Sequence, residues 1–166
     1  MTIKLPEIIT EEELIEILKV TKSPQHHIAF ALGFYEAMRV SEIVNLNRDN
    51  IDKQQRLLRI KKAKDSKDSK DRNIPIAPQV FESLEHVPLT IGVRALQTAF
   101  KKCSQEALGK DLHFHQLRHS GISHYLVKKK WSPVDVQRFA GHSRISATKA
   151  YTHINPQDLV NRMWND

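Results

Sequence analysis

Apolar side chains recur at intervals of three and four residues along most of the chain, which predicts a mainly helical protein. Residues 11–20 follow a capping box, in which Thr10 supplies the N-cap hydroxyl and Glu13 the carboxylate three residues later. Residues 25–37 are apolar around most of the helical circumference, so we expect a buried helix there. A short helix capped by Ser41 and further helical stretches are expected at 78–85, 91–108, 115–129, 133–140 and 156–164.

Two segments interrupt this helical pattern. Residues 56–62 and 72–76 are strand candidates on either side of a polar, lysine-rich tip, and residues 47–52 are expected to form a loop. A chain of 166 residues has the size of one domain with a proper core. The predicted class is therefore α+β, mainly α-helical with a small antiparallel β-sheet or hairpin, in a single domain over residues 1–166.

The composition narrows the setting in which the protein works. Hydrophobic residues make up 40% of the chain and charged residues 27%, as in globular proteins that fold in water. No apolar run approaches the length of a membrane span, and the N-terminus has no apolar signal core. Cys103 is the single cysteine, which excludes an internal disulfide and a multi-cysteine metal site. We therefore expect a cytoplasmic protein with no membrane partner.

The charge balance favours a polyanionic partner. The net charge is +7, and residues 51–75 hold nine Lys and Arg against four Asp, a local excess of five positive charges. A lysine run at 128–130 ends a predicted helix, where it suits both the helix dipole and a DNA backbone. The residues expected to contact DNA are Lys64, Lys70, Arg72, Lys128, Lys129 and Lys130.

Candidate chemistry gathers in two clusters. The first is His113-Phe-His115-Gln-Leu-Arg118-His119, and the second runs from Gly141-His142 to Tyr151. A tyrosine hydroxyl near two histidines and an arginine can attack a phosphate, because the cations neutralise the charge that develops in phosphoryl transfer. Taken singly, each histidine or tyrosine is more often an ordinary half-buried polar side chain.

Three linked motifs resemble those of the tyrosine recombinases, the phage integrase family. They are His115-x-x-Arg118-His119, Gly141-His142-Ser143 and Tyr151-Thr-His153, in the order and at the separation found in that family. Upstream, Met38-Arg39-Val-Ser-Glu42-Ile is similar to the segment that carries the family's first catalytic arginine. Ala37 stands where the family usually has glycine, a departure that concerns the local backbone shape.

The resemblance also implies a catalytic lysine in the β-hairpin, eight residues before the strand proline. Counting back from Pro75 selects Lys67. The tip repeats Asp-Ser-Lys, so a slip of three residues would select Lys64 or Lys70 instead. In the family this lysine protonates the leaving oxygen, as a mobile ammonium group can.

The activity that the resemblance implies is site-specific DNA recombination without metal, cofactor or ATP. Tyr151 would attack a DNA phosphodiester to form a 3′-phosphotyrosyl bond, while Arg39 and Arg118 hold the non-bridging oxygens. His115 would accept or relay the tyrosine proton, and His142 would donate to a phosphate oxygen. Glu42 and His119 are supporting residues. Tyr151 could act in cis or on the site of a neighbour.

The implied partners are double-stranded DNA and other recombinase protomers, with a tetramer on DNA and a monomer alone. Residues 155–166 are expected to form a C-terminal helix that docks either on a neighbouring protomer or on its own core. Family members usually carry an N-terminal core-binding domain, which this sequence is expected to lack. We therefore expect an excised or a naturally minimal catalytic domain, with weak, salt-sensitive DNA binding.

Two other functions are compatible with parts of the sequence. One is a DNA-binding module that has lost catalysis. The other is a metal-dependent hydrolase that uses His113, His115 and His119, since two histidines four residues apart on a helix suit zinc. The residues between them include no carboxylate to serve as general base and place Arg118 beside the metal, which disfavours this alternative.

Overall fold

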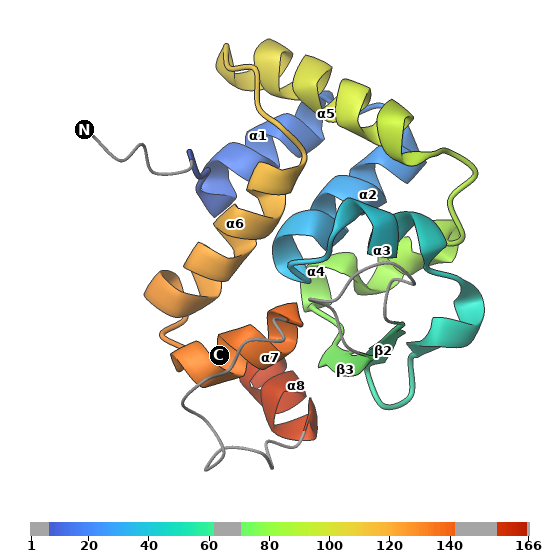
Figure 1. Cartoon of the computed structure of the whole chain (residues 1–166), viewed down its shortest axis with the longest axis vertical. Coiled ribbons are helices and arrows are strands. Elements are labelled where there is room, and N and C mark those ends of the chain that lie inside the picture. Colours follow the sequence, from blue (N-terminus) through green and yellow to red (C-terminus); the bar gives the residue numbers. More distant parts are fainter. Residues whose placement is uncertain (1–6, 62–70, 142–155, 166) are drawn as a thin grey trace.

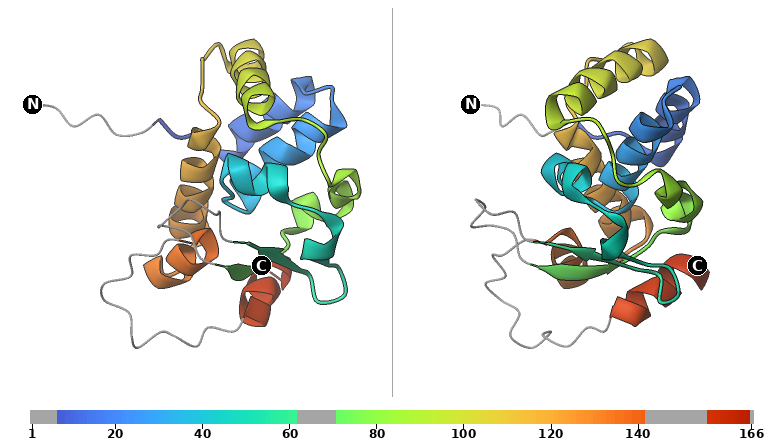
Figure 2. Two further views of the ribbon diagram at one scale, coloured as in Figure 1. Left: turned by 45° about the vertical axis from the view of Figure 1, so that its right-hand side comes forward. Right: turned by 90° about the vertical axis from the view of Figure 1, so that its right-hand side faces the viewer.

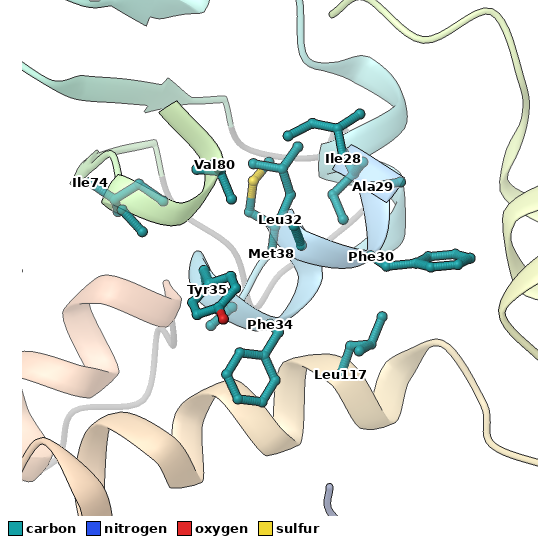
Figure 3. Close-up of a cluster of buried hydrophobic side chains, with 14 of the residues drawn as sticks. Ile28, Ala29, Phe30, Leu32, Phe34, Tyr35, Met38, Ile74, Val80 and Leu117 are labelled. Atoms are coloured by element: carbon teal, nitrogen blue, oxygen red, sulfur yellow. The ribbon is translucent and has the colours of Figure 1, made fainter. Parts of the chain in front are cut away.

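The computed structural model describes residues 7–61, 71–141 and 156–165, and its helices surround one buried helix (Figure 1). This central helix is α2 (Pro24–Tyr35), in which all eight residues from Ile28 to Tyr35 are buried. Figure 3 shows its side chains meeting Leu117 of α6, Ile74 of β3 and Val80 of α4. The expectation of a buried helix over residues 25–37 is confirmed, and Ser23 caps it one residue before Pro24.

Two peripheral helices begin and end as the sequence predicts. Helix α1 (Glu11–Val20) has the capping box, because the Thr10 hydroxyl accepts from the Glu13 amide at 3.1 Å and the Glu13 carboxylate accepts from the Thr10 amide at 3.0 Å. Helix α5 (Val93–Leu108) packs against α1. It ends at Gly109, whose φ of +69° is one that glycine adopts without strain.

Helix α6 (His115–Ser123) crosses α2 at very short distance. A Cβ atom added at Gly121 would lie 2.0 Å from the carbonyl oxygen of Phe34, so only glycine fits at this crossing. The predicted helix over 115–129 is helical from His115 to Lys128, but residues His124–Lys128 form a wider π-helical turn instead of continuing α6. This close crossing fixes where the side chains of α6 lie relative to the end of α2.

The predicted hairpin is present as strands β2 (Leu57–Ile60) and β3 (Arg72–Pro75), paired antiparallel with Leu58 opposite Ile74. A third strand, β1 (Ile51–Asp52), pairs with β2 at the other edge. It follows a 3-10 turn at Arg48–Asn50, so the expected loop at 47–52 is wrong. Two residues give too short a pattern to reveal a strand.

The short helix after α2 begins earlier than predicted. Helix α3 (Val40–Asn45) has Arg39, not Ser41, at its N-cap, because Arg39 has extended backbone and Ser41 lies within the first turn. The carboxylate of Glu42 takes the place of the expected hydroxyl and accepts a hydrogen bond from the Arg39 amide at 2.8 Å.

The remaining elements complete the covering of the sheet. Helix α8 lies against the face of the sheet opposite α3, and both views of Figure 2 show it there. Ser132 caps α7 as predicted, accepting from the Asp135 amide at 3.1 Å. The bounds of these elements are α4 Pro78–Phe81, a 3-10 turn at Glu82–His86, α7 Pro133–Ala140 and α8 Pro156–Asn165.

The C-terminal helix contacts the protein's own sheet. Leu159 and Val160 of α8 are buried, and the indole of Trp164 donates a hydrogen bond to the carbonyl of Ile76 at 2.9 Å. The guanidinium of Arg56 lies 3.7 Å from the Trp164 ring centroid. Docking of this helix on a neighbouring protomer stays a prediction.

Within the three described ranges, no helix combines the length and the apolar character that a membrane crossing requires.

Candidate functional site

Arg39 lies at the turn that joins α2 to α3. Ala37 has a positive φ of +49°, which reverses the chain direction after α2 and places Arg39 at the N-cap of α3. This is the position at which the sequence has alanine in place of the family's usual glycine, and the left-handed conformation explains why glycine suits it. The side chain of Arg39 is only 21% exposed, so its guanidinium lies largely within the protein.

Arg118 reaches the same turn from α6. Its residue is 3% exposed, and its Nη1 donates a hydrogen bond to the carbonyl oxygen of Ala37. Burial, together with the nearby charges of Arg39 and Arg72, lowers the pKa of Arg118 to about 9. Two guanidinium groups from elements almost eighty residues apart are therefore held close enough to destabilise each other.

Each of these arginines keeps one buried N–H donor without a partner. Within the described ranges, Nη1 of Arg39 and Nη2 of Arg118 are buried and make no hydrogen bond. Nη1 of Arg39 lies 3.5 Å from a Glu42 carboxylate oxygen, an ion pair without hydrogen-bond geometry. A buried unpaired donor costs about 1–3 kcal/mol, more for a charged group, so two at one place indicate a site that an anion completes.

His115 lies one helical turn before Arg118, at the start of α6. Its ring meets that of His119 edge to face, with 4.4 Å between the ring centroids. Partial burial, followed by the charges of His119, Arg118 and Arg39, lowers the pKa of His115 below its usual value of 6.5. At neutral pH His115 is therefore mainly uncharged and able to accept a proton.

Glu42 is the acid that balances this cationic cluster. It is buried, and burial alone would raise the pKa of its carboxyl, but hydrogen bonds and charge from Arg72, then from Arg39, lower it below the usual value. The two carboxylate oxygens accept from the Arg72 guanidinium at 2.7 and 3.1 Å. These contacts join Glu42 to Arg72 and Arg39, and its supporting role in the site stays a prediction.

The side chain of Arg72 is not placed as expected for the DNA contact that was predicted from the positive charge of the hairpin. Its side chain is 7% exposed and points inward, where it binds Glu42 and donates through Nε to the carbonyl of Phe139 at 3.0 Å. The contact with DNA predicted for Arg72 finds no support in this geometry. A signal was present in the sequence, because Arg72 and buried Ile74 share one face of a strand with a side-chain period of two.

The lysines at the end of the α6 region lie apart from the arginines. Lys128, Lys129 and Lys130 are exposed. They are more than a dozen residues beyond His115, which corresponds to roughly 20 Å along a helix axis. The structure thus does not bring them into the arginine cluster, and their contact with DNA stays a prediction.

Several predicted site residues lie outside the described residues. They are His142, Tyr151 and the hairpin lysines Lys64, Lys67 and Lys70. The described residue nearest to His142 in sequence is Gly141, which ends α7 with a φ of +77°. A Cβ atom added at Gly141 would lie 2.5 Å from Nη1 of Arg72, so Gly141 lies directly beside this guanidinium.

The three histidines proposed as an alternative metal site do not gather into one. In the part of the chain that the structure describes, no group of three or more His, Cys, Asp or Glu side chains is placed to hold a metal ion. His113, His115 and His119 all belong to that part, so the metal-dependent hydrolase has no support from their geometry.

Comparison with known proteins identifies the class of protein that this fold and site define. Residues 7–91 and 88–158 match the sequence model described as the phage integrase family. The chain belongs to this family, that of the tyrosine recombinases.

Particular relatives are similar over most of the chain. Tyrosine recombinase XerC of Pseudomonas fluorescens (strain Pf0-1) is 33% identical over an alignment of 148 residues, and the match covers 78% of this chain and 48% of that protein. The chain thus spans about half the length of the curated relatives it matches.

Solved structures agree with the fold. The integrase from mycobacterium phage Brujita has a TM-score of 0.79 at 16% identity, covering 98% of this chain and 58% of that chain. A lambda integrase tetramer bound to a Holliday junction has a TM-score of 0.67 at 16% identity, covering 89% of this chain and 50% of that chain. The mainly helical fold with a small antiparallel sheet is the tyrosine recombinase catalytic-domain fold, as predicted.

Proposed function

We propose that this chain is the catalytic domain of a site-specific DNA recombinase that cleaves and rejoins DNA through a 3′-phosphotyrosyl intermediate. The observation that carries the proposal is the pair of buried, unpaired N–H donors on Arg39 and Arg118. A guanidinium matches the oxygens of a phosphate and keeps its charge, so two of them fit a phosphodiester that gains charge during displacement. Membership of the phage integrase family supports DNA as the source of that phosphate.

In the proposed cleavage step, the Tyr151 oxygen forms a bond to phosphorus and the bond from phosphorus to the 5′ oxygen breaks. The tyrosine proton passes to His115, whose lowered pKa leaves it uncharged near neutral pH. Arg39 and Arg118 bind the non-bridging oxygens, and His142 donates to one of them. The leaving 5′ oxygen takes a proton from the hairpin lysine, for which Lys67 is the first choice.

Rejoining reverses these transfers and requires no external energy source. The phosphotyrosyl bond has nearly the energy of the diester that it replaces, so a 5′ hydroxyl can displace Tyr151 without ATP. All groups in this scheme are protein side chains, so we propose that neither cleavage nor rejoining depends on a metal ion.

We further propose that the protein acts on double-stranded DNA together with other protomers. The tetramer of lambda integrase bound to a Holliday junction supports this arrangement by its similar fold. Exposed Lys128, Lys129 and Lys130 would contribute contacts to the DNA backbone, which predicts binding that weakens as salt is raised. The helix α8 is proposed to exchange its own sheet for that of a neighbour in such an assembly.

Covalent trapping tests the proposal. The substrate is a pool of duplexes of randomised sequence, nicked so that cleavage releases a short fragment and prevents rejoining. With EDTA present, we expect a protein–DNA adduct that survives denaturant and disappears in Tyr151→Phe. An adduct that persists in Tyr151→Phe would contradict the assignment of the nucleophile. DNA binding without any adduct would indicate a DNA-binding module that has lost catalysis.

A sulfur substitution separates the three hairpin lysines. When the 5′ oxygen is replaced by sulfur, the leaving thiolate needs no proton, so a general acid becomes unnecessary. We expect Lys67→Ala to cleave the oxygen substrate poorly and the sulfur substrate normally. The same pattern in Lys64→Ala or Lys70→Ala, and not in Lys67→Ala, would move the assignment.

A further inference from the structure

Arg72 donates hydrogen bonds to two separate parts of the candidate site, Glu42 of α3 and Phe139 of α7. Its Nη1 and Nη2 donate to the two oxygens of Glu42 at 2.7 and 3.1 Å, a bidentate pair. Its Nε donates to the carbonyl oxygen of Phe139 at 3.0 Å. Each of the three guanidinium nitrogens thus donates a hydrogen bond inside the protein.

The same guanidinium packs against Gly141. A Cβ atom at this glycine would lie 2.5 Å from Nη1, 2.7 Å from Cζ and 2.9 Å from Nε, so the planar group lies directly on the glycine. Gly141 ends α7 and immediately precedes His142. Arg72 therefore contacts the end of α7 in two ways, through a hydrogen bond to the Phe139 carbonyl and through packing on Gly141.

Glu42 links Arg72 to Arg39, because its carboxylate contacts both residues. The carboxylate that binds Arg72 also accepts from the Arg39 amide at 2.8 Å and lies 3.5 Å from Nη1 of Arg39. The contacts form one chain from the end of α7, through β3, to the start of α3. All of its members are buried or nearly so, which makes their relative positions firm.

We propose that Arg72 is a positioning residue, which sets the Arg39 side chain and the end of α7 at Gly141 relative to each other and makes no contact with DNA. This inference rests on the proposed function. Its physical basis is geometry: the guanidinium supplies a bidentate pair and a third donor in one plane. A lysine ammonium at this position keeps the positive charge but cannot make these three contacts together.

Arg72→Lys therefore separates positioning from charge. We expect its single-turnover cleavage rate at saturating DNA to fall on the order of 10–100-fold, because small displacements of catalytic groups have large effects. Its affinity for DNA, and the slope of that affinity with salt, should stay within about twofold of the unaltered chain, because no phosphate contact is lost. Arg59→Lys is the matched control, an exposed arginine on the neighbouring strand of the same hairpin.

A double-mutant cycle tests whether Arg72 acts through Glu42. In a Glu42→Gln background, Arg72→Lys should cause little further loss of cleavage rate, since the connection is already broken. Independent losses that multiply would contradict this route. All rates are measured well below the melting temperature of each variant, and Arg72→Gln replaces Arg72→Lys if the latter does not fold.

The outcomes are distinct. An Arg72→Lys variant that cleaves as fast as the unaltered chain overturns the positioning role alone. A loss of DNA affinity that accounts for the whole loss of cleavage would instead make Arg72 a DNA contact. If the unaltered chain forms no adduct on any duplex in the pool, the proposed function fails and this inference fails with it.

Discussion

Arg118 donates a hydrogen bond from its guanidinium to the carbonyl oxygen of Ala37, two residues before Arg39. The turn that orients Arg39 therefore also supplies the carbonyl oxygen that anchors Arg118. The positive φ of Ala37 turns this carbonyl toward α6, and the close crossing of α6 and α2 at Gly121 brings Arg118 within reach. The spacing of the two guanidinium groups is thus set by backbone geometry as well as by side-chain packing.

The loss of cleavage rate on removal of Arg118 should be smaller when the scissile phosphate carries no charge. We expect Arg118→Ala to lower the rate of adduct formation by about 10²–10³-fold, the usual effect of losing one donor to a developing anion. A duplex with a methylphosphonate at the scissile position carries no charge to neutralise, so much of the rate should return. Arg94→Ala, at an exposed position on α5, is the control and should leave the rate unchanged. Equal loss on both substrates would contradict a charge-clamping role.

The pH dependence of the cleavage rate should identify His115 as the proton acceptor. The pKa of His115 lies below 6.5, so its uncharged form persists to lower pH than in a free histidine and the rate should fall only below about pH 6.5. His119→Asn removes one of the charges that lower this pKa, so the acid limb should move to higher pH. Single-turnover rates across the pH range check both expectations. An acid limb that does not move in His119→Asn would contradict the coupling.

Ala37 should tolerate glycine unusually well. Its φ of +49° strains an alanine backbone by about 1 kcal/mol, whereas glycine adopts it freely. We expect Ala37→Gly to leave the free energy of unfolding unchanged or raise it by up to about 1 kcal/mol. Ala31→Gly, equally buried but inside α2, should lower it by about 1 kcal/mol or more. Urea unfolding of both variants makes the comparison, and similar losses in both would count against strain at Ala37.

Glu36 gives the fold a pH dependence that can be removed. Complete burial raises the pKa of its carboxyl well above the usual range, although the Ala77 amide and Arg72 oppose the shift. Above about pH 4.5 the unfolded chain loses this proton while the folded chain keeps it, so Glu36 lowers stability progressively as pH rises. Glu36→Gln has no such proton. Its free energy of unfolding, relative to the unaltered chain, should therefore increase between about pH 5 and about pH 8. Parallel stability curves would show that Glu36 stays ionised.

Local signals in the sequence predicted much of the fold. The Thr10–Glu13 capping box, the all-round apolar pattern before Tyr35 and the Ser132 cap each specify one element through contacts within a few residues. The failures have equally local causes. Strand β1 is two residues long, and the N-cap of α3 is satisfied by the Glu42 side chain rather than by a hydroxyl.

The site was predictable only in part, for a different reason. Arg39, His115 and Arg118 come from separate elements, and no spacing along the chain states that they meet; the family resemblance supplied that expectation. The inward direction of Arg72 was missed because charge was given more weight than strand alternation. Buried Glu36 carried no signal at all, since the groups around it, the Ala77 amide before α4 and Arg72 of β3, are distant in sequence.

The unpaired donors of Arg39 and Arg118 have a consequence for how folding and ligand binding are linked. A chain selected for stability alone would place apolar side chains there, because a buried N–H donor without a hydrogen-bond partner destabilises the folded state. The folded domain is therefore less stable without an anion than it becomes when an anion accepts hydrogen bonds from these two donors. An anion bound only by the folded state then stabilises it in proportion to RT ln(1 + [L]/Kd), so the melting temperature of the domain becomes a gauge of phosphate occupancy at the site.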